Sequence, residues 1–282
     1  MTANLTLENL DTELAKVPML PATVTNVLCA LQRNEVNLVE VEQHLSKDPG
    51  LTMRVLRIAN SPFYGLGGRI DNIKDACIVL GVHTTRNIVL AAGTINHLAS
   101  SGKSNGLNLL ALWRHGVGTG IAAKTLAKNV HVNPETVFTA GLLHDLGKVI
   151  LDIYFPSDYT KVIAYRDKQN CLLRDAENVV LGFDHALVGA RIARRWSLPV
   201  SIADTIRDHH SINIDITSKE ANLILVADII SRGLEIGDPG DSLVPTIDPV
   251  VLQRLELDIP MIEQYFHEIE HQQQLLDGLL AD

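Results

Sequence analysis

Apolar residues recur along this chain at the three- and four-residue spacing of amphipathic helices, whereas the alternating pattern of a β-strand is almost absent. Local signals mark helix ends. Asn37, with Glu40 three residues later, has the pattern of a capping box, and Pro49 is suited to the first turn of a helix. Gly81 is placed to cap a helix that ends at Leu80. The sequence therefore predicts an all-α fold.

The predicted helices fall into two series, separated by a polar segment at residues 100–106 that has the composition of a linker. The first series covers residues 24–31, 37–45, 49–58, 73–80 and 84–98, with a glycine-rich loop at 60–68. The second series covers residues 107–130, 134–153, 156–169, 175–181, 185–196, 199–209, 219–233, 245–258 and 261–280. We therefore expect two helical lobes, residues 1–101 and residues 107–282, the second with a C-terminal helical extension.

Composition narrows the class of protein. The 282 residues are 46% hydrophobic but only 4% aromatic, so Leu, Ile, Val and Ala must build the core. Lys and Arg number 24 against 33 Asp and Glu, and no basic run is present, so we expect no nucleic-acid partner. The apolar runs are too short to span a membrane, and no signal peptide is recognisable. Three widely separated cysteines fit a reducing environment, so we expect a cytoplasmic protein with no membrane partner.

The most unusual stretch is GLLHDLGK at residues 141–148, where His144 and Asp145 interrupt an apolar run. An imidazole and a carboxylate lose hydration among leucines, so a metal ion, hydrogen bonds or a salt partner must compensate. The flanking runs predict one buried helix over residues 134–153, on which His144 and Lys148 share a face. This stretch is therefore a candidate functional site.

Other histidines and one more aspartate occupy apolar or small-residue settings on separate predicted helices. The full candidate set is His115, His144, Asp145, His185, His209, His210 and Asp228. Five imidazoles and two carboxylates from several helices are typical of a metal site in a helical bundle. A mixed His/Asp set without thiolates favours iron, manganese, zinc or magnesium. The alternative is a hydrogen-bonded core network in which Asp145 and Asp228 pair with histidines or Lys148.

The order of these residues resembles the H…HD…D pattern of the HD superfamily of metal-dependent phosphohydrolases. The matching positions are His115, His144, Asp145 and Asp228. Lys148, His185, His209 and His210 resemble the added positions of the HD-GYP subgroup, which are associated with binuclear metal sites. Residues 211–214, SINI, stand where that subgroup has a Gly-Tyr-Pro element, so we do not expect hydrolysis of cyclic dinucleotides.

Several further segments resemble the HDOD family, the HD-related output domain of bacterial signalling proteins. These are Leu20-Pro21, Asp48-Pro49, residues 56–61 (LRIANS), residues 182–186 (GFDHA) and residues 196–199 (WSLP). The resemblance covers about residues 15 to 235 and implies two helical lobes, the C-terminal one an HD-domain-like helical bundle. It also implies a regulatory module in signal transduction that acts mainly by contacts with a partner signalling protein.

The HD resemblance implies an alternative function, an active metal-dependent phosphohydrolase acting on a nucleotide or small phosphoester. His115, His144, Asp145 and Asp228 would then hold one ion, and His185, His209 and His210 would hold a second. In that enzyme Asp145 would bridge the ions and Lys148 would steady the charge of the phosphate, which makes these two the catalytic residues. A helical scaffold without bound metal is the third interpretation.

Overall fold

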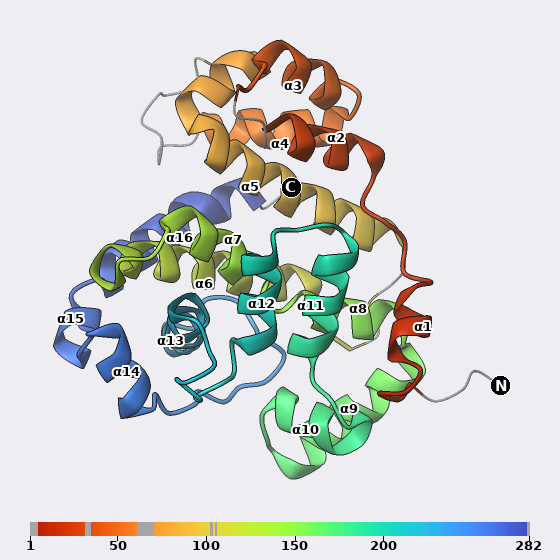
Figure 1. Ribbon diagram of the computed structural model, residues 1–282, viewed down its shortest axis with the longest axis vertical. Coiled ribbons are helices and arrows are strands. Elements are labelled where there is room, and N and C mark those ends of the chain that lie inside the picture. Colours follow the sequence, from red (N-terminus) through yellow and green to blue (C-terminus); the bar gives the residue numbers. More distant parts are fainter. Residues whose placement is uncertain (1–4, 32–34, 61–69, 102–103, 105, 281–282) are drawn as a thin grey trace. The chain divides into compact units, whose positions relative to one another are not determined.

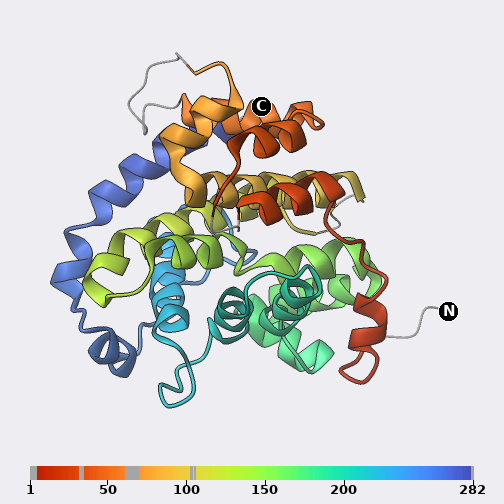
Figure 2. The same ribbon diagram turned by 45° about the horizontal axis from the view of Figure 1, so that its top comes forward.

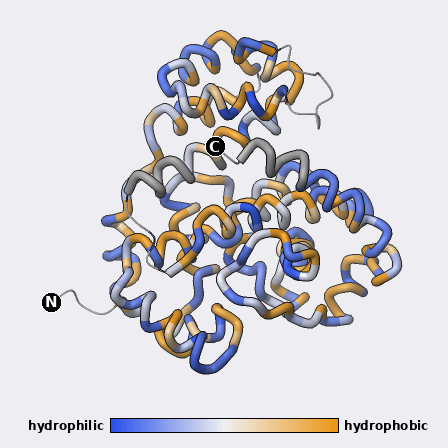
Figure 3. The backbone as a smooth tube through the Cα atoms, turned by 180° about the vertical axis from the view of Figure 1, so that it is seen from behind, coloured by the Kyte–Doolittle hydropathy of each residue, from blue (hydrophilic) through white to orange (hydrophobic). Residues whose placement is uncertain are grey.

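The computed structural model describes residues 5–31, 35–60, 70–101, 104 and 106–280, and all regular secondary structure within them is helical (Figure 1). The all-α prediction is confirmed. Hydrophobic and hydrophilic residues interleave along the helices, which is the pattern that predicted them (Figure 3). Most of the predicted loop at 60–68 and part of the predicted linker at 100–106 lie outside the described residues.

The chain divides into two compact units. The large unit comprises Met1–Met19 and Ser101–Ile269, and the small unit comprises Leu20–Ser100 and Glu270–Asp282. One division falls at residue 101, within the predicted linker, but each unit also takes in a terminal segment that is distant in sequence. The domain limits of 1–101 and 107–282 stay a prediction. They follow chain order, and chain order does not reveal which of the two cores a terminal segment joins.

The small unit contains α2 (Ala22–Leu31), α3 (Leu38–Leu45), α4 (Pro49–Ala59) and α5 (Ile73–Ser101). The Asn37 side chain accepts hydrogen bonds from the N–H groups of Val39 and Glu40, so the predicted cap of α3 is confirmed. Pro49 occupies the first turn of α4 as predicted. At Gly81 the backbone of α5 leaves the helical region (φ 76°), and the break separates the two helices predicted there.

Among the described residues, no single helix combines the length and apolar character needed to cross a membrane. The bent pair Ile73–Arg86 and Ile88–Thr94 meets both criteria only when its two segments are taken together.

The large unit contains the remaining helices. These are α1 (Leu10–Leu14), α6 (Leu109–Val130), α7 (Pro134–Leu143), α8 (Leu146–Tyr154), α9 (Pro156–Gln169), α10 (Leu173–Leu181), α11 (His185–Arg195), α12 (Val200–Asp208), α13 (Lys219–Gly233), α14 (Pro249–Leu255) and α15 (Ile259–Glu263), with the start of α16 (Phe266–Leu280). Helix α6 packs against α7 and α13, and α11 packs against α8 and α12 (Figure 2). The HD stretch therefore lies among these six packed helices.

The single helix predicted over residues 134–153 is wrong. Helix α7 ends at Leu143, His144 is its C-cap, and Asp145 is the N-cap of α8. His144 and Lys148 therefore do not share a face of one continuous helix. Both α7 and α8 are buried, so the apolar pattern continues across the break and gives no sign of it. The predicted helix over 261–280 is likewise divided between α15 and α16.

Two close backbone contacts explain why glycines flank the HD stretch. A Cβ atom added to Gly141 of α7 would lie 2.8 Å from the Cα atom of Gly120 on α6. A Cβ atom added to Gly147 of α8 would lie 1.9 Å from the backbone oxygen of His185 on α11. These distances leave no room for a side chain. The glycines thereby hold α6, α7, α8 and α11 close around the His144–Asp145 break.

Candidate metal centre

The structure brings together all seven side chains predicted for the site, and they come from five places in the large unit. His115 lies in the middle of α6, His185 is the first residue of α11, and Asp228 lies in α13. His144 and Asp145 form the break between α7 and α8, and His209 and His210 follow α12. Apart from His210, which is partly exposed, each of these residues is at most 5% exposed.

His115, His144 and Asp145 form the first of two groups, with their ligand atoms all within 4.8 Å of one another. Nε2 of His144 lies 3.3 Å from Oδ2 of Asp145. Nε2 of His115 lies 2.8 Å from Oδ1 of Asp228, so this second carboxylate also borders the group. Bonds of about 2 Å from one ion to several ligands require spacings of this size. The first group therefore has the dimensions of a metal site.

His185, His209 and His210 form the second group, again with all ligand atoms within 4.8 Å. Nε2 of His210 lies 3.0 Å from Nε2 of His185. Oδ1 of Asp145 lies 3.1 Å from Nε2 of His185, which means that Asp145 faces both groups. Asp145 would therefore help to hold an ion in either group.

Three histidines are oriented by hydrogen bonds through Nδ1. Nδ1 of His144 lies 2.6 Å from the Gly141 carbonyl oxygen, and Nδ1 of His209 lies 2.7 Å from that of Ile206. Nδ1 of His185 lies 2.6 Å from Oε2 of Glu177. A ring that donates its Nδ1–H keeps Nε2 as the electron-pair donor, which is how proteins orient metal-binding histidines.

The Nε2 atoms of His144 and His209 are buried without a hydrogen-bond partner among the described residues. Leaving such an atom unpaired costs about 1–3 kcal/mol, whereas coordination of a cation would satisfy it. The residues present therefore fit a metal ion better than a closed hydrogen-bonded network.

The ionisation of the centre follows from its burial and its charges. Burial alone would raise the pKa of Asp145, but the charges of His144 and Lys148 outweigh it and hold this pKa well below its usual range. Burial likewise opposes the charge of Asp228, yet Arg232 and His115 keep its pKa well below the usual value. Both carboxylates are therefore ionised at neutral pH.

The histidines respond differently to the same surroundings. Burial lowers the pKa of His115, and burial together with neighbouring imidazoles lowers the pKa values of His209 and His210 well below the usual one. Burial also opposes the charged form of His185, but the carboxylate of Glu177 prevails and raises the pKa of His185 to about 9. Three of the candidate ligands are thus neutral at pH 7, the form that binds metal.

Lys148 and Arg232 hold the two carboxylates in place. Nζ of Lys148 lies 2.8 Å from Oδ2 of Asp145 and donates a second hydrogen bond, 2.9 Å long, to the Pro239 carbonyl oxygen. Nε of Arg232 lies 2.9 Å from Oδ1 of Asp228. Arg232 was not among the residues predicted for the site, although its position four residues after Asp228 on a predicted helix was a usable signal. Glu177 was not predicted either, and its spacing along the chain offered no signal.

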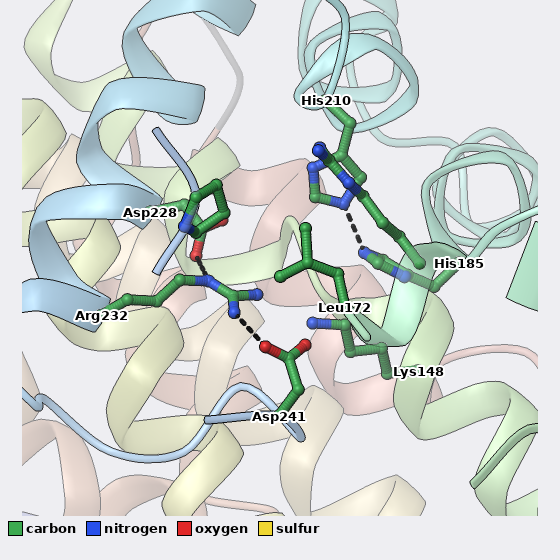
Figure 4. A pocket seen from close by; sticks show the side chains of 9 residues that line it. Lys148, Leu172, His185, His210, Asp228, Arg232 and Asp241 are labelled. Atoms are coloured by element: carbon green, nitrogen blue, oxygen red, sulfur yellow. Dashed lines mark hydrogen bonds and ion pairs between the residues drawn. The ribbon is translucent and has the colours of Figure 1, made fainter. Parts of the chain in front are cut away.

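A pocket opens beside the second group (Figure 4). Its lining includes Lys148, Arg174, His185, His210, Arg232 and Asp241. Nη1 of Arg232 lies 2.7 Å from Oδ1 of Asp241, so this guanidinium is neutralised from two sides. Nε of Arg174 lies 3.7 Å from Oδ1 of the exposed Asp175, a looser pairing. Arg174 is therefore the pocket cation with most capacity for an incoming anion.

An all-α bundle with this His/Asp centre is an HD-related module, and comparison with known proteins identifies the family. Residues 17–212 match the HDOD domain, and the chain belongs to the HDOD family.

Similar proteins share both sequence and fold. The crystal structure of an HDOD domain protein of unknown function from Geobacter sulfurreducens is 28% identical, with a TM-score of 0.77 over 97% of this chain and 99% of that one. A candidate phosphohydrolase from Shewanella amazonensis SB2B, 23% identical, shares the fold with a TM-score of 0.76 over 96% and 97% of the two chains. An uncharacterised protein of Treponema pallidum (strain Nichols) is 27% identical over 198 residues, which are 70% of this chain. The match spans 38% of that relative's length.

Proposed function

We propose that this protein is an HDOD-type regulatory module in signal transduction, whose His/Asp centre binds one or two divalent metal ions and which acts mainly by contacts with a partner signalling protein. Family membership supports the regulatory part. The orientation of His144, His185 and His209 supports metal binding. Each ring donates its Nδ1–H to an acceptor outside the set of ligands and so turns Nε2 toward the centre.

In this proposal the two ions have different ligands. His115, His144, Asp145 and Asp228 would hold the first, and His185, His209 and His210 would hold the second, with Asp145 between them. Iron, manganese, zinc and magnesium all suit a set of imidazoles and carboxylates without thiolates. Bound divalent ions would supply Lewis acidity toward an anionic ligand.

Elemental analysis of the full chain, purified without chelator, tests whether the His/Asp centre binds metal. We expect one to two divalent ions per chain and a large loss in His144→Ala. His83→Ala removes an exposed histidine of the small unit and should keep the wild-type content. Equal metal content in all three proteins would reject the proposal.

An active metal-dependent phosphohydrolase is the second candidate, and the pocket beside the second group favours it. An anionic group that enters there would meet His185, His210 and Arg174, which all line the pocket. Lys148, the cation assigned to the phosphate by sequence, is already bonded to Asp145 and Pro239, so Arg174 is better placed to bind a nucleotide or phosphoester.

A screen of phosphomonoesters, nucleotides and cyclic dinucleotides with Mn²⁺ or Zn²⁺ separates the two functions. Metal-dependent turnover that Asp145→Ala abolishes would favour the enzyme. In that case Arg174→Ala should raise KM for the phosphoester, whereas Arg207→Ala, which removes a surface guanidinium paired with Asp204 and Asp208, should not. No turnover of any substrate would favour the regulatory module.

A further inference from the structure

We infer that Glu177 is a positioning residue that fixes the ring of His185, so that the second ion position depends on a side chain outside the set of ligands. This inference rests on the metal centre proposed above. It concerns how the two positions differ, which the sequence motifs do not address.

Glu177 lies in α10 and is completely buried. Its Oε2 accepts two hydrogen bonds from His185, one of 2.8 Å from the backbone N–H and one of 2.6 Å from Nδ1. Its Oε1 accepts a 2.9 Å hydrogen bond from the hydroxyl group of Tyr159, which is also completely buried. Both carboxylate oxygens are thus engaged, so Glu177 acts on the centre through His185.

The two bonds to His185 constrain different parts of that residue. The bond to the backbone N–H holds the first residue of α11, where helical N–H groups have no partner within the helix. The bond to Nδ1 fixes the rotation of the ring and assigns the proton to Nδ1. When a metal ion replaces the proton on Nε2, this atom would be the ligand, and it faces Asp145 at 3.1 Å.

The other oriented histidines depend on local backbone. His144 and His209 each use a carbonyl oxygen three residues earlier in the chain, and no side-chain substitution removes that acceptor. Only His185 among these three is oriented by a side chain from another helix. A change at Glu177 should therefore weaken the second ion position and leave the first unchanged.

Zinc titration calorimetry on the full chain, after removal of bound metal, tests this inference. Glu177→Met removes both acceptors at similar size, and we expect it to weaken binding of the second zinc ion about 10- to 100-fold while the first is unaffected. Glu177→Gln keeps an acceptor oxygen for both bonds from His185, and its amide can donate to Tyr159. It should restore most of the affinity.

Tyr159→Phe is the matched control, because it removes the third hydrogen bond of Glu177 and leaves both bonds to His185 intact. It should lower the thermal midpoint without moving either zinc affinity. Long-range ¹H–¹⁵N spectra of the zinc-loaded wild type give an independent measurement, in which His185 should carry its proton on Nδ1.

The outcomes distinguish this inference from the proposed function. A wild type that binds no zinc would overturn both. Two zinc ions bound equally tightly by wild type and Glu177→Met would overturn the role of Glu177 alone and leave the metal centre standing. If Glu177→Met does not fold, the spectra of the wild type decide, and a His185 proton on Nε2 in the zinc-loaded protein would refute the inference.

Discussion

Oδ1 of Asp145 lies 3.1 Å from Nε2 of His185, a residue forty positions later in the chain. The other oxygen of Asp145, Oδ2, lies 3.3 Å from Nε2 of His144 in the first group. One carboxylate therefore contacts both groups of histidines. Loss of Asp145 should affect both ion positions, whereas loss of a single histidine should affect mainly one.

His144→Ala and Asp145→Ala should lose metal and thermal stability together. An ion that binds only the native state stabilises it by about 2.7 kcal/mol when the free ion is at 100 times its Kd. Differential scanning calorimetry with and without added metal measures this stabilisation, which Asp145→Ala should lack and His144→Ala should show only in part. Asp215→Ala, at an exposed position, is the control and should respond to metal like the wild type. A metal response retained in Asp145→Ala would contradict the assignment.

Gly147→Ala should destabilise the large unit by several kcal/mol, because the new Cβ atom would lie 1.9 Å from the backbone oxygen of His185 and neither backbone segment can move freely. Gly233→Ala is the matched control, since no atom lies within 4 Å of its Cβ position. It should be neutral or stabilise by up to about 1 kcal/mol. Urea unfolding measures both, and equal midpoints for the two variants would show that α8 and α11 are not in close contact.

The metal-free protein should lose stability as the pH rises from 6.5 to 9. Burial opposes the charge on His185, but Glu177 and Asp145 raise its pKa to about 9 from an ordinary value of 6.5. A raised pKa means that protonation favours the native state. This contribution is complete below pH 6.5 and disappears as the pH passes 9, a change on the order of 1–3 kcal/mol.

Urea unfolding of chelator-treated protein across this pH range measures the effect. His185→Gln lacks the titrating group, so its free energy of unfolding should change less over the same interval. Parallel pH profiles for wild type and variant would exclude His185 as the source.

Purified protein should show weak or no turnover of cyclic dinucleotides, even when it is loaded with metal. Hydrolysis requires groups that orient the phosphodiester, and residues 211–214 (SINI) replace the Gly-Tyr-Pro element. Liquid chromatography of reactions with Mn²⁺ checks this, with wild type and Asp145→Ala in parallel. Robust hydrolysis by the wild type alone would contradict the prediction and favour the phosphohydrolase.

The sequence by itself determined the helical class and the identity of the candidate ligands. Helical periodicity and caps such as Asn37 act over a few residues, so they can be recognised along the chain. The polar pair His144 and Asp145 was visible because burial of such side chains among leucines requires compensation. The residue types of the centre therefore needed no coordinates.

Only the tertiary structure decided how these residues are arranged. Apolar periodicity continues through the break at His144 and Asp145, so local pattern predicted one helix where two exist. Lys148 reaches a carbonyl oxygen 91 residues away, and Glu177 finds His185 on a different helix. Hydrogen bonds between separate helices depend on how the helices pack. The distance between two residues along the chain does not tell whether packing brings them into contact.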